Sequence, residues 1–130
     1  MRAHVCIGLG FDRYAVAVEH VREVTELGTV VPVPGAGPRI AGVRHLRGEI
    51  LPVVRLRELV GASAGIPRRL VVVQEGTRCA GLAVDRADCV ADLPEPSGPA
   101  ERLMRGTVLH DGAAHSVLDV PALLDAVRAR

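Results

Sequence analysis

The stretch "GVRHLRGEILPVVRLREL", from Gly42 to Leu59, decides the fold, because a short polar turn interrupts two apolar runs within it. Gly48 accepts the positive φ that a tight turn requires, so the stretch predicts a β-hairpin with Gly48 as a structural turn residue. Arg47, the first residue of this turn, is then expected to project from the hairpin tip into solvent. No hydrophobic core needs an arginine at that place.

The same pattern recurs near the C-terminus, which predicts two related units. The Arg-Gly turn aligns with an Asp-Gly turn, so that Gly48 matches Gly112, 64 positions later. The segments "VEHVREVTEL" (18–27) and "VDRADCVADL" (84–93) align at the similar offset of 66 positions. Each half is short for an independent domain, so the two units are expected to pack on each other.

Further strands are predicted on both sides of these turns. Alternation of apolar and polar residues predicts a hairpin over 5–18, and "RLVVVQ" and "CAGLAVD" flank the turn "EGT" in the same way. The prolines of "EVTELGTVVPVPGAGPR" and the composition of "PEPSGPAE" predict extended connections. One helical stripe is expected at the C-terminus, formed by Val120, Leu123, Leu124 and Val127.

Composition excludes several classes of function. The chain has 130 residues, 48% apolar and 2% aromatic residues, and a formal net charge of +1. A small β-barrel that binds nucleic acid, the alternative from another functional class, would need a basic groove and aromatic stacking platforms, so no nucleic-acid partner is expected. Without a long apolar run, we expect no direct membrane insertion and a cytoplasmic protein.

No catalytic, cofactor or metal site is indicated by the motifs. The segment "GAGPRIAGVR" has glycines at Walker spacing, but it lacks the Lys-Ser/Thr pair and precedes a strand, so no phosphate cradle is predicted. The three cysteines, Cys6, Cys79 and Cys89, are widely spaced and are expected to be buried structural thiols. His110 and His115 flank the last turn without metal-site spacing. We therefore predict a protein that is not an enzyme and binds no cofactor.

Five stretches, in order, resemble the CheW-like domain, the coupling module of bacterial chemotaxis. "HLRGEILPVVRLREL" is similar to the family's Leu-Arg-Gly segment, and "YAVAVEHVREV" to its early segment. "VVPVP" followed by "IAGVRHLRG" is similar to its approach to that turn, and "AGLAVDRADCV" and "VLDVPALL" resemble its later motifs. The resemblance covers about residues 3 to 127, which is nearly the whole chain.

The resemblance implies an all-β fold of two small five-stranded SH3-like barrels packed together, with a short C-terminal helix. It implies one domain over 1–130, whose approximate halves are 14–62 and 68–118. The first half is expected to exchange strands with the chain termini. No catalysis is implied. The expected function is that of an adaptor coupling transmembrane chemoreceptors to a histidine kinase, so the module would be recruited to membrane-associated receptor arrays.

The resemblance also implies partners and partner-binding residues. The expected partners are the regulatory domain of the histidine kinase and the cytoplasmic hairpin tip of a chemoreceptor. The family's motifs place Val21, Glu23 and Arg47 in the binding region, and Arg44 is close enough in sequence to assist electrostatically. A planar guanidinium at a hairpin tip is suited to two-point bonding of a partner's carboxylates.

The chain departs from the family pattern at two positions. His45 stands where the family usually has Asn, and Arg55 where it has Asp. An Asp there would cap the following helix, whereas Arg has no acceptor; the second copy keeps its Asp, Asp119. These departures leave a second function open, a CheW-like scaffold of a non-chemotactic chemosensory pathway such as surface motility or development.

Overall fold

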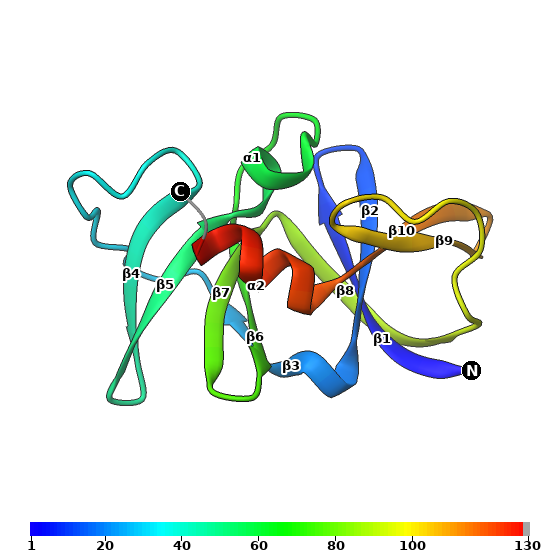
Figure 1. The fold of residues 1–130 in the computed structure, drawn as a ribbon, viewed down its shortest axis with the longest axis horizontal. Coiled ribbons are helices and arrows are strands. Elements are labelled where there is room, and N and C mark those ends of the chain that lie inside the picture. Colours follow the sequence, from blue (N-terminus) through cyan, green and yellow to red (C-terminus); the bar gives the residue numbers. More distant parts are fainter. Residues whose placement is uncertain (129–130) are drawn as a thin grey trace.

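Two five-stranded sheets form the computed structural model, which describes residues 1–128. The last two residues of the expected 1–130 domain lie outside the described part. The first sheet has the order β8-β1-β2-β10-β9 (Figure 1). Its strands are β1 (Arg2–Leu9), β2 (Asp12–Ala17), β8 (Arg86–Leu93), β9 (Met104–His110) and β10 (Ala113–Leu118).

The second sheet has the order β3-β6-β7-β5-β4. Its strands are β3 (Val21–Glu26), β4 (Ile40–Leu46), β5 (Glu49–Arg55), β6 (Arg69–Glu75) and β7 (Arg78–Val84). A 3-10 turn, η1 (Val18–His20), and two helices, α1 (Leu56–Val60) and α2 (Val120–Arg128), complete the described elements. None of the described helices is long and apolar enough to cross a membrane.

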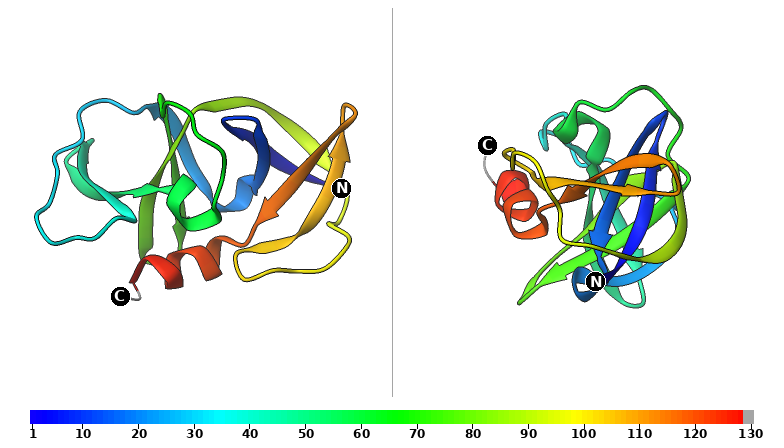
Figure 2. Two further views of the ribbon diagram at one scale, coloured as in Figure 1. Left: turned by 90° about the horizontal axis from the view of Figure 1, so that it is seen from above. Right: turned by 90° about the vertical axis from the view of Figure 1, so that its right-hand side faces the viewer.

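The two sheets have the same topology, as the sequence repeat predicts. Each contains a hairpin from one half of the chain, β1–β2 or β6–β7, and three strands from the other half. Each also contains one parallel pair, β2 with β10 and β5 with β7. Each sheet therefore exchanges strands between the halves of the chain (Figures 1 and 2). The limits expected for the halves, 14–62 and 68–118, stay a prediction.

The two aligned turns have the same backbone conformation. Arg47 and Asp111 each have a φ of 50°, and the following Gly48 and Gly112 have φ of 81° and 74°. Both dipeptides connect antiparallel neighbours, β4 with β5 and β9 with β10. Two consecutive positive φ angles match the strand twist of a hairpin, and glycine at the second position adopts its angle at no steric cost.

The hydrophobic core lies mainly between the two sheets. It includes Ile7, Leu9 and Val16 of the first sheet, and Val71 and Leu82 of the second. Helix α2 contributes Val120, Leu123 and Leu124, and Val127, the fourth residue of the predicted stripe, packs against this core half-buried. The helix lies across the junction of the sheets in Figure 1. Smaller clusters fill the opposite face of each sheet, around Val53, Leu70 and Val72 in the second and around Ala15, Leu93 and Val117 in the first.

The two helices begin differently, in line with the departure at Arg55. Asp119 caps α2, because its Oδ1 accepts a hydrogen bond of 3.1 Å from the backbone N–H of Ala122. Arg55 precedes α1 and makes no side-chain cap; its Nη1 donates instead to the carbonyl oxygens of Pro38 and Ile40. Arg55 therefore fastens the connection before β4 to the end of β5.

Candidate functional site

Glu23 and Arg47 meet across the seam of the second sheet, the opening between its two edge strands, β3 and β4. Glu23 lies on β3, and Arg47 lies at the tip of the β4–β5 hairpin. Arg47 Nε donates to Glu23 Oε1 at 3.2 Å and Nη2 donates to Oε2 at 3.3 Å. The hydrogen bonds to Glu23, and then its charge, raise the pKa of Arg47 above its ordinary value.

The two partners of this ion pair differ in exposure. The side chain of Arg47 is 72% exposed and that of Glu23 is 20% exposed. Glu23 therefore lies mostly against the protein and orients the guanidinium, while the outer face of Arg47 is exposed to solvent. An exposed pair of this kind contributes little to stability.

A second ion pair, between Arg22 and Glu49, bridges the same seam. Arg22 Nη1 also contacts Sγ of Cys79 at 3.5 Å. Regular alternation would place Arg22 on the face opposite Glu23, but the ladder between β3 and β6 shifts its register between Val21 and Glu23. This bulge was missing from the sequence analysis, as were Arg22 and Glu49. We define the charged seam as Arg22, Glu23, Arg47 and Glu49.

Val21 and Arg44, the other two expected binding residues, have different surroundings. Val21 begins β3 and packs, half-buried, against the core between the sheets. Arg44 Nε donates to the carbonyl oxygen of Leu27 at 2.8 Å, and its Nη1 donates to that of His45. The guanidinium of Arg44 thus fastens β4 to the end of β3, and its role in binding stays a prediction.

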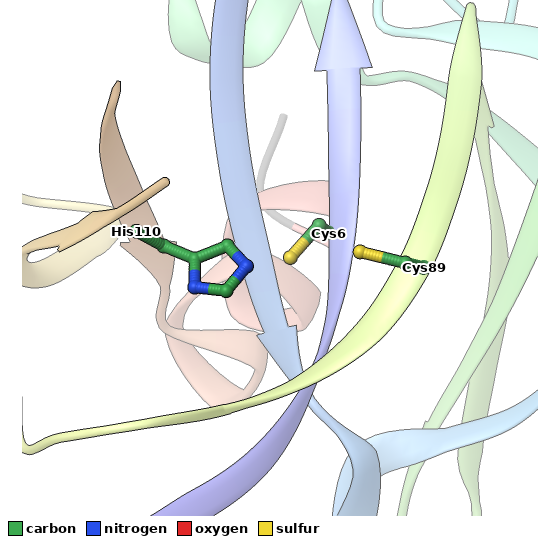
Figure 3. Close-up of side chains that lie close together, drawn as sticks. All are labelled: Cys6, Cys89 and His110. Atoms are coloured by element: carbon green, nitrogen blue, oxygen red, sulfur yellow. The ribbon is translucent and has the colours of Figure 1, made fainter. Parts of the chain in front are cut away.

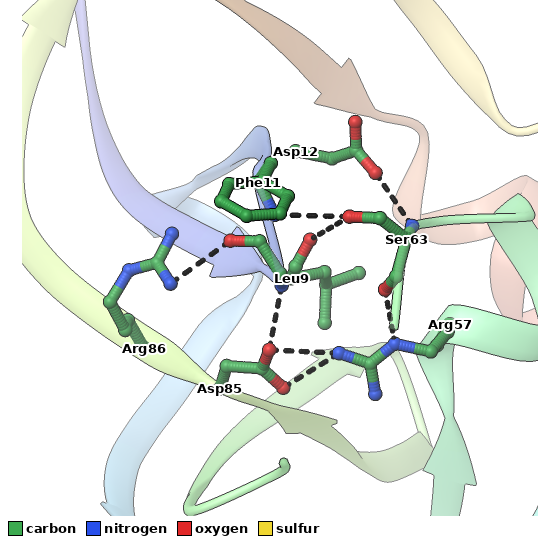
Figure 4. Close-up of polar contacts among 8 residues, drawn as sticks. Leu9, Phe11, Asp12, Arg57, Ser63, Asp85 and Arg86 are labelled. Carbon is green, nitrogen blue, oxygen red and sulfur yellow. Dashed lines mark hydrogen bonds and ion pairs between the residues drawn. The ribbon is translucent and has the colours of Figure 1, made fainter. Parts of the chain in front are cut away.

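A polar network joins the two sheets at the β1–β2 turn and the loop after α1 (Figure 4). Asp85, between β7 and β8, accepts from Arg57 Nη2 at 2.8 Å with both oxygens, and from the backbone N–H of Gly10 at 2.6 Å. Arg57 Nε donates to the carbonyl oxygen of Ser63 at 2.6 Å. The backbone N–H of Ser63 in turn donates to Asp12 Oδ2 at 2.7 Å. These contacts tie the β1–β2 turn to helix α1 and its following loop.

A pocket of about 350 Å³ opens at the end of the second sheet near α1. Its lining combines apolar residues, among them Leu27, Val30, Val53, Leu56 and Pro67, with the charged residues Arg55, Arg57 and Glu58. The β4–β5 tip that carries Arg47 lies at the far end of the same strands (Figure 1). The pocket and the charged seam therefore lie at opposite ends of the second sheet.

Comparisons with known proteins agree with this architecture. Residues 3–128 match the family model of the CheW-like domain. The chain is 36% identical to protein FrzA of Myxococcus xanthus, over 96% of this chain and 86% of that protein. It is 28% identical to the chemotaxis protein CheW of Thermotoga maritima, over 92% of this chain and 82% of the relative.

A solved structure shows the same fold. The crystal structure of the scaffolding protein TtCheW from Thermoanaerobacter tengcongensis superposes with a TM-score of 0.83 at 23% identity, covering 92% of this chain and 84% of that one. The two sheets are therefore the two SH3-like barrels of the CheW fold, as predicted. With this fold and a family match over nearly its whole length, the chain belongs to the CheW-like domain family.

Proposed function

We propose that this chain holds the regulatory domain of a histidine kinase on one surface and the cytoplasmic hairpin tip of a chemoreceptor on another. Membership of the CheW-like family makes the chain a non-catalytic scaffold of chemotaxis signal transduction that couples receptors to a kinase. The domains that touch it, and the residues that they touch, are the proposal. We place the complex in the cytoplasm, at membrane-associated receptor arrays.

One observation carries the assignment of a binding surface, namely the two-point ion pair between Glu23 and Arg47. Glu23 uses both carboxylate oxygens to hold the guanidinium in one orientation. Ordering the side chain before a partner arrives lowers the entropy lost on binding. The exposed part of Arg47 can then interact with a carboxylate or with the carbonyl oxygens at a helix C-terminus of the partner.

Bridging requires no large affinity at either surface. Each contact is expected to have a dissociation constant in the micromolar range, roughly 8 kcal/mol of binding free energy. When many receptors and kinases are joined in one array, effective concentration makes the assembly persist although each contact is weak. Signal transmission then depends on the geometry that the scaffold imposes, and the chain needs no chemistry of its own.

A second pathway is favoured by one comparison. The identity to protein FrzA, 36%, is higher than the 28% to the Thermotoga chemotaxis protein. A scaffold of a non-chemotactic chemosensory pathway, such as surface motility or development, would present the same kind of surface to a different kinase and receptor. Binding measured against each kinase regulatory domain of the source genome separates the two pathways.

Titration calorimetry tests the proposal directly. The full chain is titrated with the isolated regulatory domain of the kinase and, separately, with a receptor cytoplasmic hairpin. We expect saturable binding to both, with one partner still binding when the other is present. A folded chain that binds neither partner contradicts the proposal, and so does competition of the two partners for one surface.

A further inference from the structure

Three side chains that are common metal ligands meet at the seam of the first sheet. Cys6 comes from β1, Cys89 from β8 and His110 from the end of β9. Their ligand atoms all lie within 4.8 Å of one another. Figure 3 shows the imidazole and both sulfur atoms directed into the same space between the strands. The seam of this sheet is the opening between its two edge strands, β8 and β9. Cys6 and Cys89 lie on the β8 side of this seam, and His110 lies on the β9 side.

Strand pairing fixes the positions of these residues. Cys6 and Cys89 are direct partners in the ladder between β1 and β8, next to a register shift that follows Cys6. His110 pairs with Ala113 at the last rung before the β9–β10 turn. Cys6 is buried, whereas Cys79 is only half-buried and Cys89 is exposed, so the expectation of three buried thiols is confirmed for Cys6 alone. His110 is half-buried. The cluster is thus held by paired strands, next to an irregularity in the ladder, and Cys89 is accessible from solvent.

The internal repeat shows what the same positions hold in the second sheet. The equivalent pairs are Cys6 and Val72, Cys89 and Glu23, His110 and Leu46, and Asp111 and Arg47. In the second sheet the Glu23–Arg47 ion pair ties the edge strands together. In the first sheet the equivalent of Arg47 is an acid, so that ion pair has no counterpart there. A cation between Cys89 and His110 would take its place.

The charges around the cluster also favour a cation. Asp88 precedes Cys89 in the chain, and Asp111 follows His110. Asp111 Oδ2 lies 3.5 Å from His110 Nε2. Negative charge therefore stands on two sides of the ligand atoms, and a bound cation would offset it.

We propose that Cys6, Cys89 and His110 bind a thiophilic metal ion of the Zn²⁺ class, which closes the seam of the first sheet. Thiolate sulfur and imidazole nitrogen are the ligands that Zn²⁺ prefers. Binding would release one proton from each thiol to solvent, and a water molecule would take the fourth position. In a tetrahedral site the ligand atoms are roughly 3.5–3.8 Å apart, so small side-chain rotations suffice. A disulfide between the cysteines would use two of the three residues and leave His110 without a role.

Zinc titration of the reduced, chelator-treated full chain tests the site. We expect one Zn²⁺ per chain, with at least roughly tenfold weaker binding in Cys89→Ser and in His110→Ala, since each variant removes one ligand. Cys79→Ser is the matched control and should bind like the parent chain, because Cys79 lies on β7 of the second sheet. Co²⁺ serves as a spectroscopic probe, and its thiolate charge-transfer band should weaken in Cys89→Ser. Circular dichroism confirms that each variant is folded.

Two results would overturn the proposal. The first is a folded, reduced chain that binds no Zn²⁺, or that binds it equally well after Cys89→Ser and His110→Ala. The second is air oxidation to a Cys6–Cys89 disulfide at the same rate with and without Zn²⁺, since coordinated thiolates should be protected. Arg47 lies at the tip of a hairpin of the second sheet, so Arg47→Glu should leave Zn²⁺ affinity unchanged.

Discussion

Glu23 and Arg47 are 24 residues apart in the sequence and form a two-point ion pair across the seam of the second sheet. The pair depends on the two features that define the fold. The β4–β5 turn places the arginine, and the bulge in β3 directs the carboxylate toward it. Both residues are expected to bind a partner because of the family resemblance, and the structure shows them in contact with each other.

Reversing the charge of Arg47 should weaken partner binding and leave the fold intact. For Arg47→Glu we expect a dissociation constant roughly 5- to 30-fold higher, because the variant places a second carboxylate beside Glu23. The side chain of Arg47 is 72% exposed, so the free energy of unfolding should change little. Calorimetry and urea unfolding measure the two effects.

The charge-swapped double variant Glu23→Arg with Arg47→Glu serves as the control. It keeps an ion pair across the seam but exchanges the charges that a partner meets. If Arg47 contacts the partner, the swap should bind as poorly as Arg47→Glu alone. Recovery of parent affinity in the swap would show that the pair acts only within the domain.

Removing the carboxylate of Asp85 should destabilise the whole domain. The side chains of Asp85 and Arg57 are only 9% and 18% exposed, and Asp85 also accepts the N–H of Gly10. Asp85→Ala leaves a largely buried guanidinium without its partner, so we expect a loss of about 3 kcal/mol in urea unfolding. Arg2→Ala, which breaks the exposed pair with Glu19, is the comparison and should cost less than about 1 kcal/mol. Equal losses in the two variants would refute the structural role of the network.

Asp12 should make stability depend on pH in the acid range. Hydrogen bonds from the backbone N–H and then the hydroxyl of Ser63 lower its pKa. A lowered folded-state pKa stabilises the protein above the unfolded value, near pH 4, and this contribution disappears as the pH falls through the folded value. The stability difference between the parent and Asp12→Asn should therefore be constant above about pH 5 and shrink below about pH 4. A difference that does not change with pH would argue against this linkage.

Helix α2 should depend on its cap. The Asp119 carboxylate accepts the N–H of Ala122, and the helix carries Leu123 and Leu124 into the core between the sheets. Asp119→Ala should lower the free energy of unfolding by about 1 kcal/mol, whereas Asp119→Asn keeps an acceptor oxygen and should lose only a few tenths. Urea unfolding of both variants checks the expectation, and an equal loss in the two would assign the effect to charge and not to the cap.

The local features of this fold were predictable from sequence. A glycine after a polar residue between apolar runs specifies a hairpin turn, and both predicted turns, ending at Gly48 and Gly112, connect paired strands. The repeat followed from matched spacing, and the two sheets have the same strand order. The α2 stripe followed from helical periodicity. The turns and the helical stripe depend on interactions between residues near one another in the chain, and the repeat is visible in the sequence itself.

Contacts between residues far apart in the chain were harder to predict from the sequence. The contact of Arg57 with Asp85 spans 28 residues, and that of Asp85 with Gly10 spans 75. Cys6 and Cys89 become neighbours only because strands from opposite halves of the chain pair in the first sheet. The bulge that brings Arg22 to the same seam as Glu23 leaves no signal in the residue pattern. Such contacts follow from register, which alternation alone does not fix.

The most direct test of the scaffold assignment is a recruitment experiment. A receptor cytoplasmic hairpin is immobilised, the kinase regulatory domain is passed over it, and retention of the kinase domain is measured as the concentration of this chain is raised. We expect retention that requires the chain, that rises and then falls as excess chain saturates each partner separately, and that weakens with Arg47→Glu. Retention that does not depend on the folded chain, or a chain that binds one partner only by releasing the other, would contradict it.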